Sequence, residues 1–409
     1  CLADNYSYFQ EENLMENNTS TSQRHAVLFH GRSGEYFSIW LVNALLTIIT
    51  LGIYSAWATV RRRRYFYGNT EIAGDRFDYH ARPIDILKGR IIVFVGLVLF
   101  FILSAALPTI SLVFLLAFFA LVPWIVVRSW RYNALMSSFR GVRFNYHCRI
   151  GRAYWTMYLA PVLMIAALYL VVGMIGMMAA TSGNISAALT VGVLCFVLFL
   201  AGLAAVQGTV AAMNHDLYIN NMFYGQQPFK AELQKKTFIK MVLISFAIML
   251  PFLIVAGMLI GSLFISLIYA AAMGMSDPAM MGNLMGGNLF NIFLTFVVLI
   301  FGGLVSSAYL IAAQRNYVFG QTQLGEKLRL KSTLSTGSFL ALTLTNTLIV
   351  IFTLGLGAPI AEIRLARYLA NATALEGDIS LLDISAHHES ARTAVAEEVV
   401  AAFDLNPGI

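Results

Sequence analysis

Long blocks of apolar residues, almost empty of charge, constrain this chain more than any other feature. The blocks span 36–58, 91–130, 154–178, 187–213, 241–274, 289–313 and 338–360, and Arg128 is their one Asp, Glu, Lys or Arg. Each block approaches or exceeds the ~20 residues with which a helix crosses a bilayer. Only 12% of the chain is charged, against about 25% in soluble domains. These features predict a polytopic helical membrane protein.

The positive charges indicate how the chain is oriented in the membrane. Lys and Arg gather in the loops 58–90, 128–152, 214–240 and 314–336, whereas the alternate connections hold none. Since cytoplasmic loops carry the excess of Lys and Arg, the basic loops are expected to face the cytoplasm. The formal net charge of +6 is then a signature of topology, and no nucleic-acid partner is predicted.

The basic loops are copies of one motif, which we call the RxxRY box. It reads R-x-x-R-Y, eight residues, Gly, then R-F-x-Y-H, and it recurs at offsets of 67 and 303 residues. Boxes lie near 57–82, 124–149, 217–229, 315–330 and 361–380, and the latter half of a box precedes the first apolar block at an offset of 117 from the second box. Each box predicts a helix that continues past the bilayer, a turn, and a short strand-like stretch.

Two of the apolar blocks, 36–58 and 338–360, lie between boxes on both sides and share a Thr-Leu-Gly break. Either they are broken, partly re-entrant segments with both ends inside, or they cross fully and place both termini outside. Paired broken segments often line transporter sites. The single asparagines of the two blocks, Asn43 and Asn346, are therefore candidate polar residues of a pathway.

The predicted fold is an all-α polytopic membrane protein with about six full transmembrane helices and the two broken segments. In the alternative, all eight segments cross fully. Residues 1–25 are expected to be disordered, 26–378 to form a single membrane domain with internal repeats, and 379–409 to form a soluble acidic tail. The sequence does not indicate an oligomeric state.

The arginines and tyrosines of the boxes suit the membrane interface. Arginines three residues apart share a helix face and can reach lipid phosphates while their stems lie along apolar surface. Tyrosine is enriched at the same depth. The candidates for contact with anionic lipid headgroups are Arg61, Arg64, Tyr65, Arg128, Arg131, Tyr132, Arg364, Arg367 and Tyr368. Alternatively, these residues only anchor the topology and cap the helices.

The sequence contains no motif that predicts chemistry. The three cysteines form no CxxC pair, and no P-loop, GxGxxG or GxSxG appears, so no catalytic residue, cofactor or metal site is predicted. The spans lack ionisable residues near their centres, which argues against proton-coupled pumping. The favoured function is a passive or facilitated pathway for a small or lipidic solute. A membrane scaffold or regulator that docks a partner protein is the alternative, and an enzyme is not expected.

Five stretches of the chain resemble the YjgN family of bacterial inner-membrane proteins, a domain-of-unknown-function family. They read "FHGRSGEYF", "NALLTIITLGIYSAWA", "RYFYGNTEIAGDRFDYH", "RYNALMSSFRGVRFNYHC" and "LRLKSTL". The resemblance covers most of residues 26–370. It implies a multi-spanning protein of the bacterial inner membrane with undetermined activity, and it supplies no catalytic residues.

Overall fold

A computed structural model describes residues 24–106, 108–181, 185–272, 282, 286–325, 328–377 and 379. Most of the predicted disordered N-terminus and of the predicted acidic tail lies outside these described residues. The strands are β1 Arg24–Phe29, β2 Thr70–Ile72, β3 Asp75–Tyr79, β4 Ser137–Phe139, β5 Val142–Tyr146, β6 Met222–Tyr224, β7 Gln227–Ala231, β8 Thr322–Leu324, β9 Leu328–Ser332 and β10 Thr373–Glu376. The helices are α2 Ser33–Ile49, α3 Ser55–Gly68, α4 Pro83–Ala106, α5 Pro108–Met136, α6 Ile150–Tyr154, the π-helical η1 Trp155–Leu159, α7 Ala160–Ala180, α8 Ile185–Ile219, α9 Lys235–Ala272, α11 Leu289–Gln321, α12 Thr336–Phe352 and α13 Ala358–Asn371.

The strands form one closed antiparallel barrel in the order β1-β10-β9-β8-β7-β6-β5-β4-β3-β2. The prediction of an all-α fold was therefore wrong. The strands are only three to six residues long. An isolated hairpin of two such strands is marginally stable in water. The strands persist because closure of the barrel gives every strand two partners and leaves no open edge.

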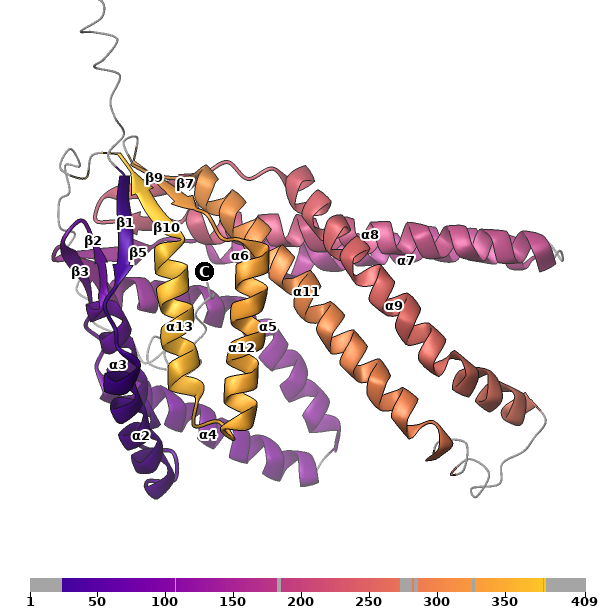
Figure 1. Ribbon diagram of the computed structural model, residues 1–409, viewed down its shortest axis with the longest axis horizontal. Helices are drawn as coiled ribbons and strands as arrows, with labels where there is room; N and C mark the ends of the chain where they lie inside the picture. The colour runs from indigo at the N-terminus through magenta and orange to yellow at the C-terminus, as the bar shows by residue number, and fades with distance from the viewer. Residues whose placement is uncertain are drawn as a thin grey trace, which may run out of the picture.

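The barrel assembles the boxes into a ring of repeats. Four boxes supply the hairpins β2-β3, β4-β5, β6-β7 and β8-β9. The fifth hairpin is divided between the two ends of the chain, where Arg24 of β1 pairs with Glu376 of β10. Helical hairpins connect one box to the next, so that α2 and α3, for example, join the paired strands β1 and β2. Figure 1 shows the strands gathered at one end and the helices leaving from them.

An alternation of apolar and polar residues directs one face of each strand into the barrel. In β3, Phe77 faces the barrel interior and Tyr79 is buried against α3 and α4, whereas Arg76 and Asp78 are exposed. Facing the next hairpin, the Phe77 ring lies 4.8 Å from that of Phe139, centroid to centroid. The period of two is what a strand with one buried face requires. The strand-like stretch predicted for each box is thus one wall of an aromatic core.

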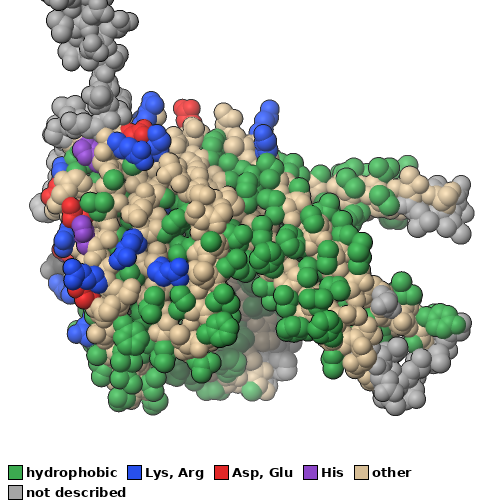
Figure 2. Space-filling view, in the orientation of Figure 1, with side chains coloured by type: hydrophobic (Ala, Val, Ile, Leu, Met, Phe, Trp, Pro, Cys, Tyr) green, Lys and Arg blue, Asp and Glu red, His purple; other side chains and the backbone are tan. Residues whose placement is uncertain are grey.

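Within the described residues, six helices are long and apolar enough to cross a membrane. They span Pro83–Ala105, Ser111–Met136, Ile150–Met178, Thr190–Ile219, Lys235–Gly261 and Leu289–Gln321. They fan out from the barrel (Figure 1), and charged side chains gather over the barrel end while hydrophobic side chains cover much of the fan (Figure 2). At most 17% of each apolar window is buried within the chain. An uncovered apolar surface of this extent suits lipid and not water, which confirms the membrane class.

Both Thr-Leu-Gly segments break as the sequence predicts, and in the same way. The first segment ends α2 at Ile49 and starts α3 at Ser55, with Leu51 at φ +50° and Gly52 at φ +92°. The Thr50 hydroxyl donates to the Leu46 carbonyl at 2.7 Å and accepts from the backbone N–H of Tyr54, the residue before α3, at 2.9 Å. One threonine therefore ends one helix and caps the next.

The second copy repeats this turn. Leu354 and Gly355 have φ values of +50° and +92°, and the Thr353 hydroxyl bonds forward to the Gly357 N–H at 2.7 Å. Each of α2 and α12 has 17 residues, or about 25 Å of helix, which is less than the ~30 Å hydrocarbon core. Since β1 pairs with β2 and β9 with β10, each short hairpin leaves the barrel and returns to the same end. Of the two interpretations, the geometry matches the re-entrant one.

The two short hairpins meet and close the ring of helices. The Tyr36 hydroxyl of α2 donates to Glu362 of α13 at 2.7 Å, and Arg62 of α3 lies 3.3 Å from the same carboxylate oxygen. The Tyr36 ring is 1% exposed and packs on Tyr65 and Phe66 at centroid distances of 5.2 and 5.0 Å. The first and last helical hairpins are thereby joined by one buried tyrosine.

Candidate functional site

The interior of the barrel encloses a cavity of about 460 Å³, which we call the chamber. All ten strands contribute to its wall, together with α3, α11 and α13. Its strand residues are Val27, Phe29, Thr70, Ile72, Phe77, Phe139, Phe144, Tyr224, Phe229, Leu324, Leu328, Leu330, Thr373 and Leu375. The wall is therefore almost entirely apolar and rich in phenylalanine, which suits an apolar ligand of small-molecule size.

A second cavity of about 280 Å³ adjoins the chamber and shares five lining residues with it: Phe77, Phe144, Phe229, Phe319 and Leu330. It extends to Asn133 near the end of α5 and to Tyr218 near the end of α8. The apolar space inside the barrel thus leads toward the ends of the membrane helices.

One arginine reaches the chamber from a membrane helix. Arg315 of α11 donates to the Thr373 hydroxyl at 3.0 Å, and its guanidinium carbon lies 4.3 Å from the centre of the Phe319 ring. Its Nε is buried without a hydrogen-bond partner, and no carboxylate of the described residues lies within 4.0 Å of it. A buried guanidinium held by one hydroxyl and a ring face is only partly compensated, so an acidic group in the chamber would be stabilised there.

The chamber wall also contains a tyrosine whose hydroxyl is engaged. Tyr224 of β6 donates to the Phe139 carbonyl of β4 at 2.9 Å. Burial raises the pKa of Tyr224 to about 12, so the phenol stays neutral at physiological pH. It therefore adds no charge to the chamber.

In the first box, the predicted interface residues bind the protein itself. Arg64 donates to the carbonyl oxygens of Tyr79 and Ala81 at 3.2 and 3.4 Å. The Tyr65 hydroxyl accepts the Arg32 N–H at 2.8 Å. Arg61 is exposed and donates to the Tyr54 hydroxyl at 3.0 Å.

The C-terminal box repeats these contacts. Arg367 donates to the Gly31 carbonyl at 3.0 Å, and the Tyr368 hydroxyl donates to the Ser335 carbonyl at 3.1 Å. Arg364 instead donates to the side chain of Asn346 at 2.8 Å. In both boxes the second arginine and the tyrosine hold backbone at the junction of strand and helix, which is the structural role left open by the sequence.

The two asparagines lie inside the helical bundle. Asn43 is 7% exposed, and its side-chain oxygen is buried without a hydrogen-bond partner. Asn346 donates to the Ala361 carbonyl at 3.2 Å and accepts from Arg364. Among the described contacts none joins Asn43 to Asn346, so a shared polar pathway between them stays a prediction.

The second box forms one wall of a pocket. This cavity of about 770 Å³, which we call the arginine pocket, lies between α5 and the junction of β5 with α6. Its lining comprises Val127, Arg128, Arg131, Tyr146, His147, Cys148, Arg149, Ile150, Arg152 and Asn221. Of the predicted interface residues, Arg128 and Arg131 line it, Arg128 lies 5.7 Å over the ring of Trp124, and Tyr132 is buried beside them.

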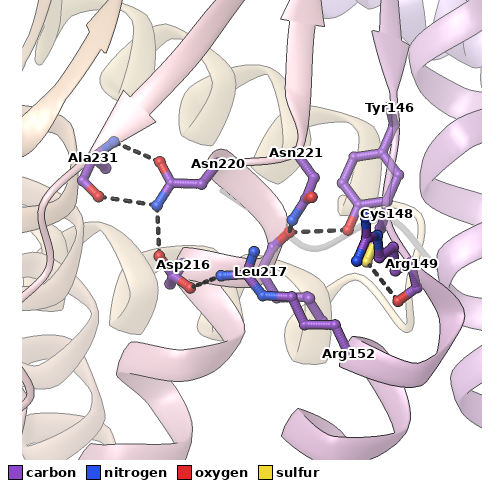
Figure 3. Close-up of polar contacts among 9 residues, drawn as sticks. All are labelled: Tyr146, Cys148, Arg149, Arg152, Asp216, Leu217, Asn220, Asn221 and Ala231. Atoms are coloured by element: carbon purple, nitrogen blue, oxygen red, sulfur yellow. Dashed lines mark hydrogen bonds and ion pairs between the residues drawn. The ribbon is translucent and has the colours of Figure 1, made fainter.

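Contacts between repeats fix one wall of the arginine pocket (Figure 3). Arg152 pairs with Asp216 of α8 at 2.7 Å, and Asp216 accepts from the Asn220 amide at 2.5 Å. Asn220 in turn bonds both the N–H and the carbonyl of Ala231 in β7. The Tyr146 hydroxyl donates to the Leu217 carbonyl at 3.0 Å. Sequence reasoning selected neither Arg149 nor Arg152, although their spacing copies that of Arg128 and Arg131.

Cys148 in this pocket is expected to react slowly with thiol reagents at neutral pH. Burial raises the pKa of the Cys148 thiol, although its contact with Tyr146 and the charge of Arg152 act in the opposite direction. A raised pKa leaves less thiolate, which is the reactive form. Alkylation by iodoacetamide should be slower than that of free cysteine at pH 7 and should still be rising above pH 9. A Cys148→Ser variant identifies the contribution of this site, and a rate equal to that of free cysteine at pH 7 would contradict the assignment.

No three His, Cys, Asp or Glu side chains of the described residues lie together in a group that could hold a metal ion. The three histidines that share one repeat position, His30, His80 and His147, each contact a different partner. His30 lies 2.9 Å from Glu71, His80 lies 2.7 Å from the Ser138 hydroxyl, and His147 packs on the ring of Phe223.

Comparison with known proteins identifies the family of the chain. A family model described as "Bacterial protein of unknown function (DUF898)" matches residues 24–402. The chain belongs to this family. The DUF898 match begins at the first strand of the barrel and includes all five helical hairpins.

Two relatives carry the name Inner membrane protein YjgN. The protein from Salmonella typhimurium is 30% identical over 373 residues, which cover 89% of this chain and 91% of the relative. The protein from Escherichia coli is 28% identical over 362 residues, which cover 88% and 90% respectively. No solved structure matches the chain. These relatives and the six apolar helices confirm the predicted family and an integral membrane protein.

Proposed function

We propose that this DUF898 chain forms a pathway for a small or lipidic solute in the bacterial inner membrane, with the barrel on the cytoplasmic side. The observation that carries the proposal is the apolar chamber, to which all ten strands contribute. A barrel that served only as a structural cap would gain stability by filling this space, because interiors pack to near-crystalline density. An apolar cavity at the base of a membrane bundle suits a solute that arrives from the hydrocarbon core.

The route follows from the adjoining cavities. The smaller one lies beside the chamber and is lined by residues near the ends of α5, α8 and α11, where the apolar spans of those helices end. Arg315 supports an amphiphilic solute over a plain hydrocarbon, because its guanidinium lies in a mostly apolar wall. The other arginine of that wall, Arg140, is paired with Asp75 at 2.6 Å. The proposal involves no catalytic step. The orientation rests on the excess of Lys and Arg at the barrel end, as is typical of cytoplasmic segments.

Photolabelling in nanodiscs tests the chamber. The probe is a phosphatidylcholine with a diazirine near the end of one acyl chain, and labelled peptides are located by mass spectrometry. We expect label on barrel strands that line the chamber, such as those of Phe77 and Phe229. In proteoliposomes, the chain should also speed the access of dithionite to inner-leaflet phosphatidylcholine that carries a nitrobenzoxadiazole fluorophore.

A pair of variants on α13 provides the control. Ala366→Trp adds bulk to the chamber wall and should strongly reduce both signals. Leu365→Trp makes the same kind of change on the neighbouring residue, which is 37% exposed and does not line the chamber, and should leave both signals unchanged. Label confined to the outer faces of the helices in the unmodified chain would refute the proposal. Equal labelling and equal dithionite access in the two folded variants would also refute it.

A further inference from the structure

The arginine pocket has the composition of an anion site. Four guanidinium groups line it, and no carboxylate of the described residues does. Positive groups around one cavity repel each other, and the cost is largest where water is partly excluded. An anion in the cavity converts this repulsion into attraction. Two walls each contribute a pair of arginines three residues apart, Arg128 with Arg131 and Arg149 with Arg152.

The charge at the start of the helix differs between the second box and the repeats before it. Arg152 occupies the repeat position of Glu35 in the N-terminal half box and of Asp85 in the first box. The second box thus carries a base where these two repeats carry an acid. The matching carboxylate, Asp216, comes from α8 and holds Arg152 in place at 2.7 Å.

The remaining lining and the depth of the pocket indicate the kind of anion. Val127 and Ile150 add apolar surface beside the arginines, and about 770 Å³ is much more than one small ion fills. Arg128 and Arg152 lie near the barrel-side ends of the apolar spans Ser111–Met136 and Ile150–Met178, the depth at which lipid headgroups are found. Guanidinium groups match phosphate with two parallel hydrogen bonds.

We propose that the arginine pocket binds a phosphate group, supplied either by an anionic phospholipid headgroup or by a soluble phosphate. Arg128, Arg131 and Arg149 contact the phosphate oxygens, and Arg152, held by Asp216, supports the far wall. This site is separate from the chamber, so its test does not depend on the proposed pathway.

The test replaces one arginine from each wall. In native mass spectrometry with added phosphatidylglycerol, the Arg128→Gln/Arg149→Gln double variant should bind the lipid about 100-fold more weakly, because each charge-assisted hydrogen-bond contact to the phosphate contributes about tenfold or more. The Arg128→Lys/Arg149→Lys variant keeps the charge but loses the paired hydrogen bonds. Its affinity for the lipid should lie between that of the unmodified chain and that of the Gln double variant. Helix content by circular dichroism confirms that each variant is folded.

The first box offers a matched control. Arg61 and Arg82 occupy the repeat positions of Arg128 and Arg149, so Arg61→Gln/Arg82→Gln removes the same charge from the same barrel end. It should weaken phosphatidylglycerol binding by less than about twofold, because only unspecific surface attraction is lost. Equal losses in the two double variants would show general attraction and would overturn the proposal.

A second arm identifies the source of the phosphate. Inorganic phosphate is titrated against chloride at equal ionic strength, and the thermal midpoint of the detergent-solubilised chain is followed. A rise in the unmodified chain that the Arg128→Gln/Arg149→Gln variant lacks indicates a soluble phosphate. If the variant loses phosphatidylglycerol binding but responds to inorganic phosphate as the unmodified chain does, the phosphate belongs to a lipid headgroup. If that double variant changes neither measurement, the site does not exist.

Discussion

Replacing Tyr36 with alanine is expected to lower the free energy of unfolding by about 3–5 kcal/mol, the range for buried aromatic residues truncated to alanine. The ring is 1% exposed and packs between Tyr65 and Phe66. Its hydroxyl also holds Glu362 of the last helical hairpin. The loss of stability should be greatest where β1 and β10 close the barrel. The substitution should therefore accelerate hydrogen exchange more in β1 and β10 than in β4 and β5.

Two further variants separate the contributions of Tyr36. Tyr36→Phe keeps the ring and removes only the hydrogen bond to a charged group, with an expected loss of about 1.5–3 kcal/mol. Ile48→Ala truncates a residue of the same helix that is 72% exposed, and should change stability by less than about 0.5 kcal/mol. Denaturant titration in detergent micelles measures all three. If the Tyr36→Ala chain is as stable as the Ile48→Ala chain, the contact between the first and last helical hairpins does not hold the ring of helices closed.

A methyl group at Gly208 is expected to destabilise the chain by about 1–3 kcal/mol, as overpacking does in well-packed interiors. A Cβ at this position would lie 2.6 Å from both the N and the Cα of Ile239 in the neighbouring helix α9. Backbone cannot rotate away as a side chain can, so α8 and α9 must separate. Close approach of helices at small residues is the usual way in which membrane helices pack.

Gly192 of the same helix provides the control for this substitution. No atom lies within 4 Å of a Cβ built there, and alanine is the better helix former by roughly 1 kcal/mol. Gly192→Ala should therefore leave the thermal midpoint unchanged or raise it, whereas Gly208→Ala should lower it. A lower midpoint for both variants would mean that the close contact of α8 with α9 is not the cause.

Sequence reasoning found the parts of this fold but not their assembly. The apolar blocks predicted the membrane helices, and the shared Thr-Leu-Gly correctly marked the breaks near Gly52 and Gly355. The barrel was missed because strands of three to six residues, taken one box at a time, look like turns between spans. Closure depends on β1 pairing with β10, a contact between the two ends of the chain that no local pattern encodes.

The candidate site was predictable only in part, for a related reason. The repeats selected Arg128 and Arg131, which line one pocket, but the same pattern in the first box placed Arg64 on backbone carbonyl oxygens. Sequence spacing cannot show which carbonyl an arginine reaches, because the partner is set by the fold. A signal for the pocket did exist, since the repeat offsets align Arg152 with two acidic residues.

The hairpin divided between the two ends of the chain affects the order in which the protein can be built. β1 emerges from the ribosome early and can pair with β2, but its other edge has no partner until β10 is made. At about 5–20 residues per second, that edge stays open for tens of seconds. During this interval β1 presents an open sheet edge, to which a strand of another chain can add. Completion of the barrel therefore depends on β10, the last of its strands to be synthesised, and a chain truncated before β10 would leave both β1 and β9 as unprotected edges.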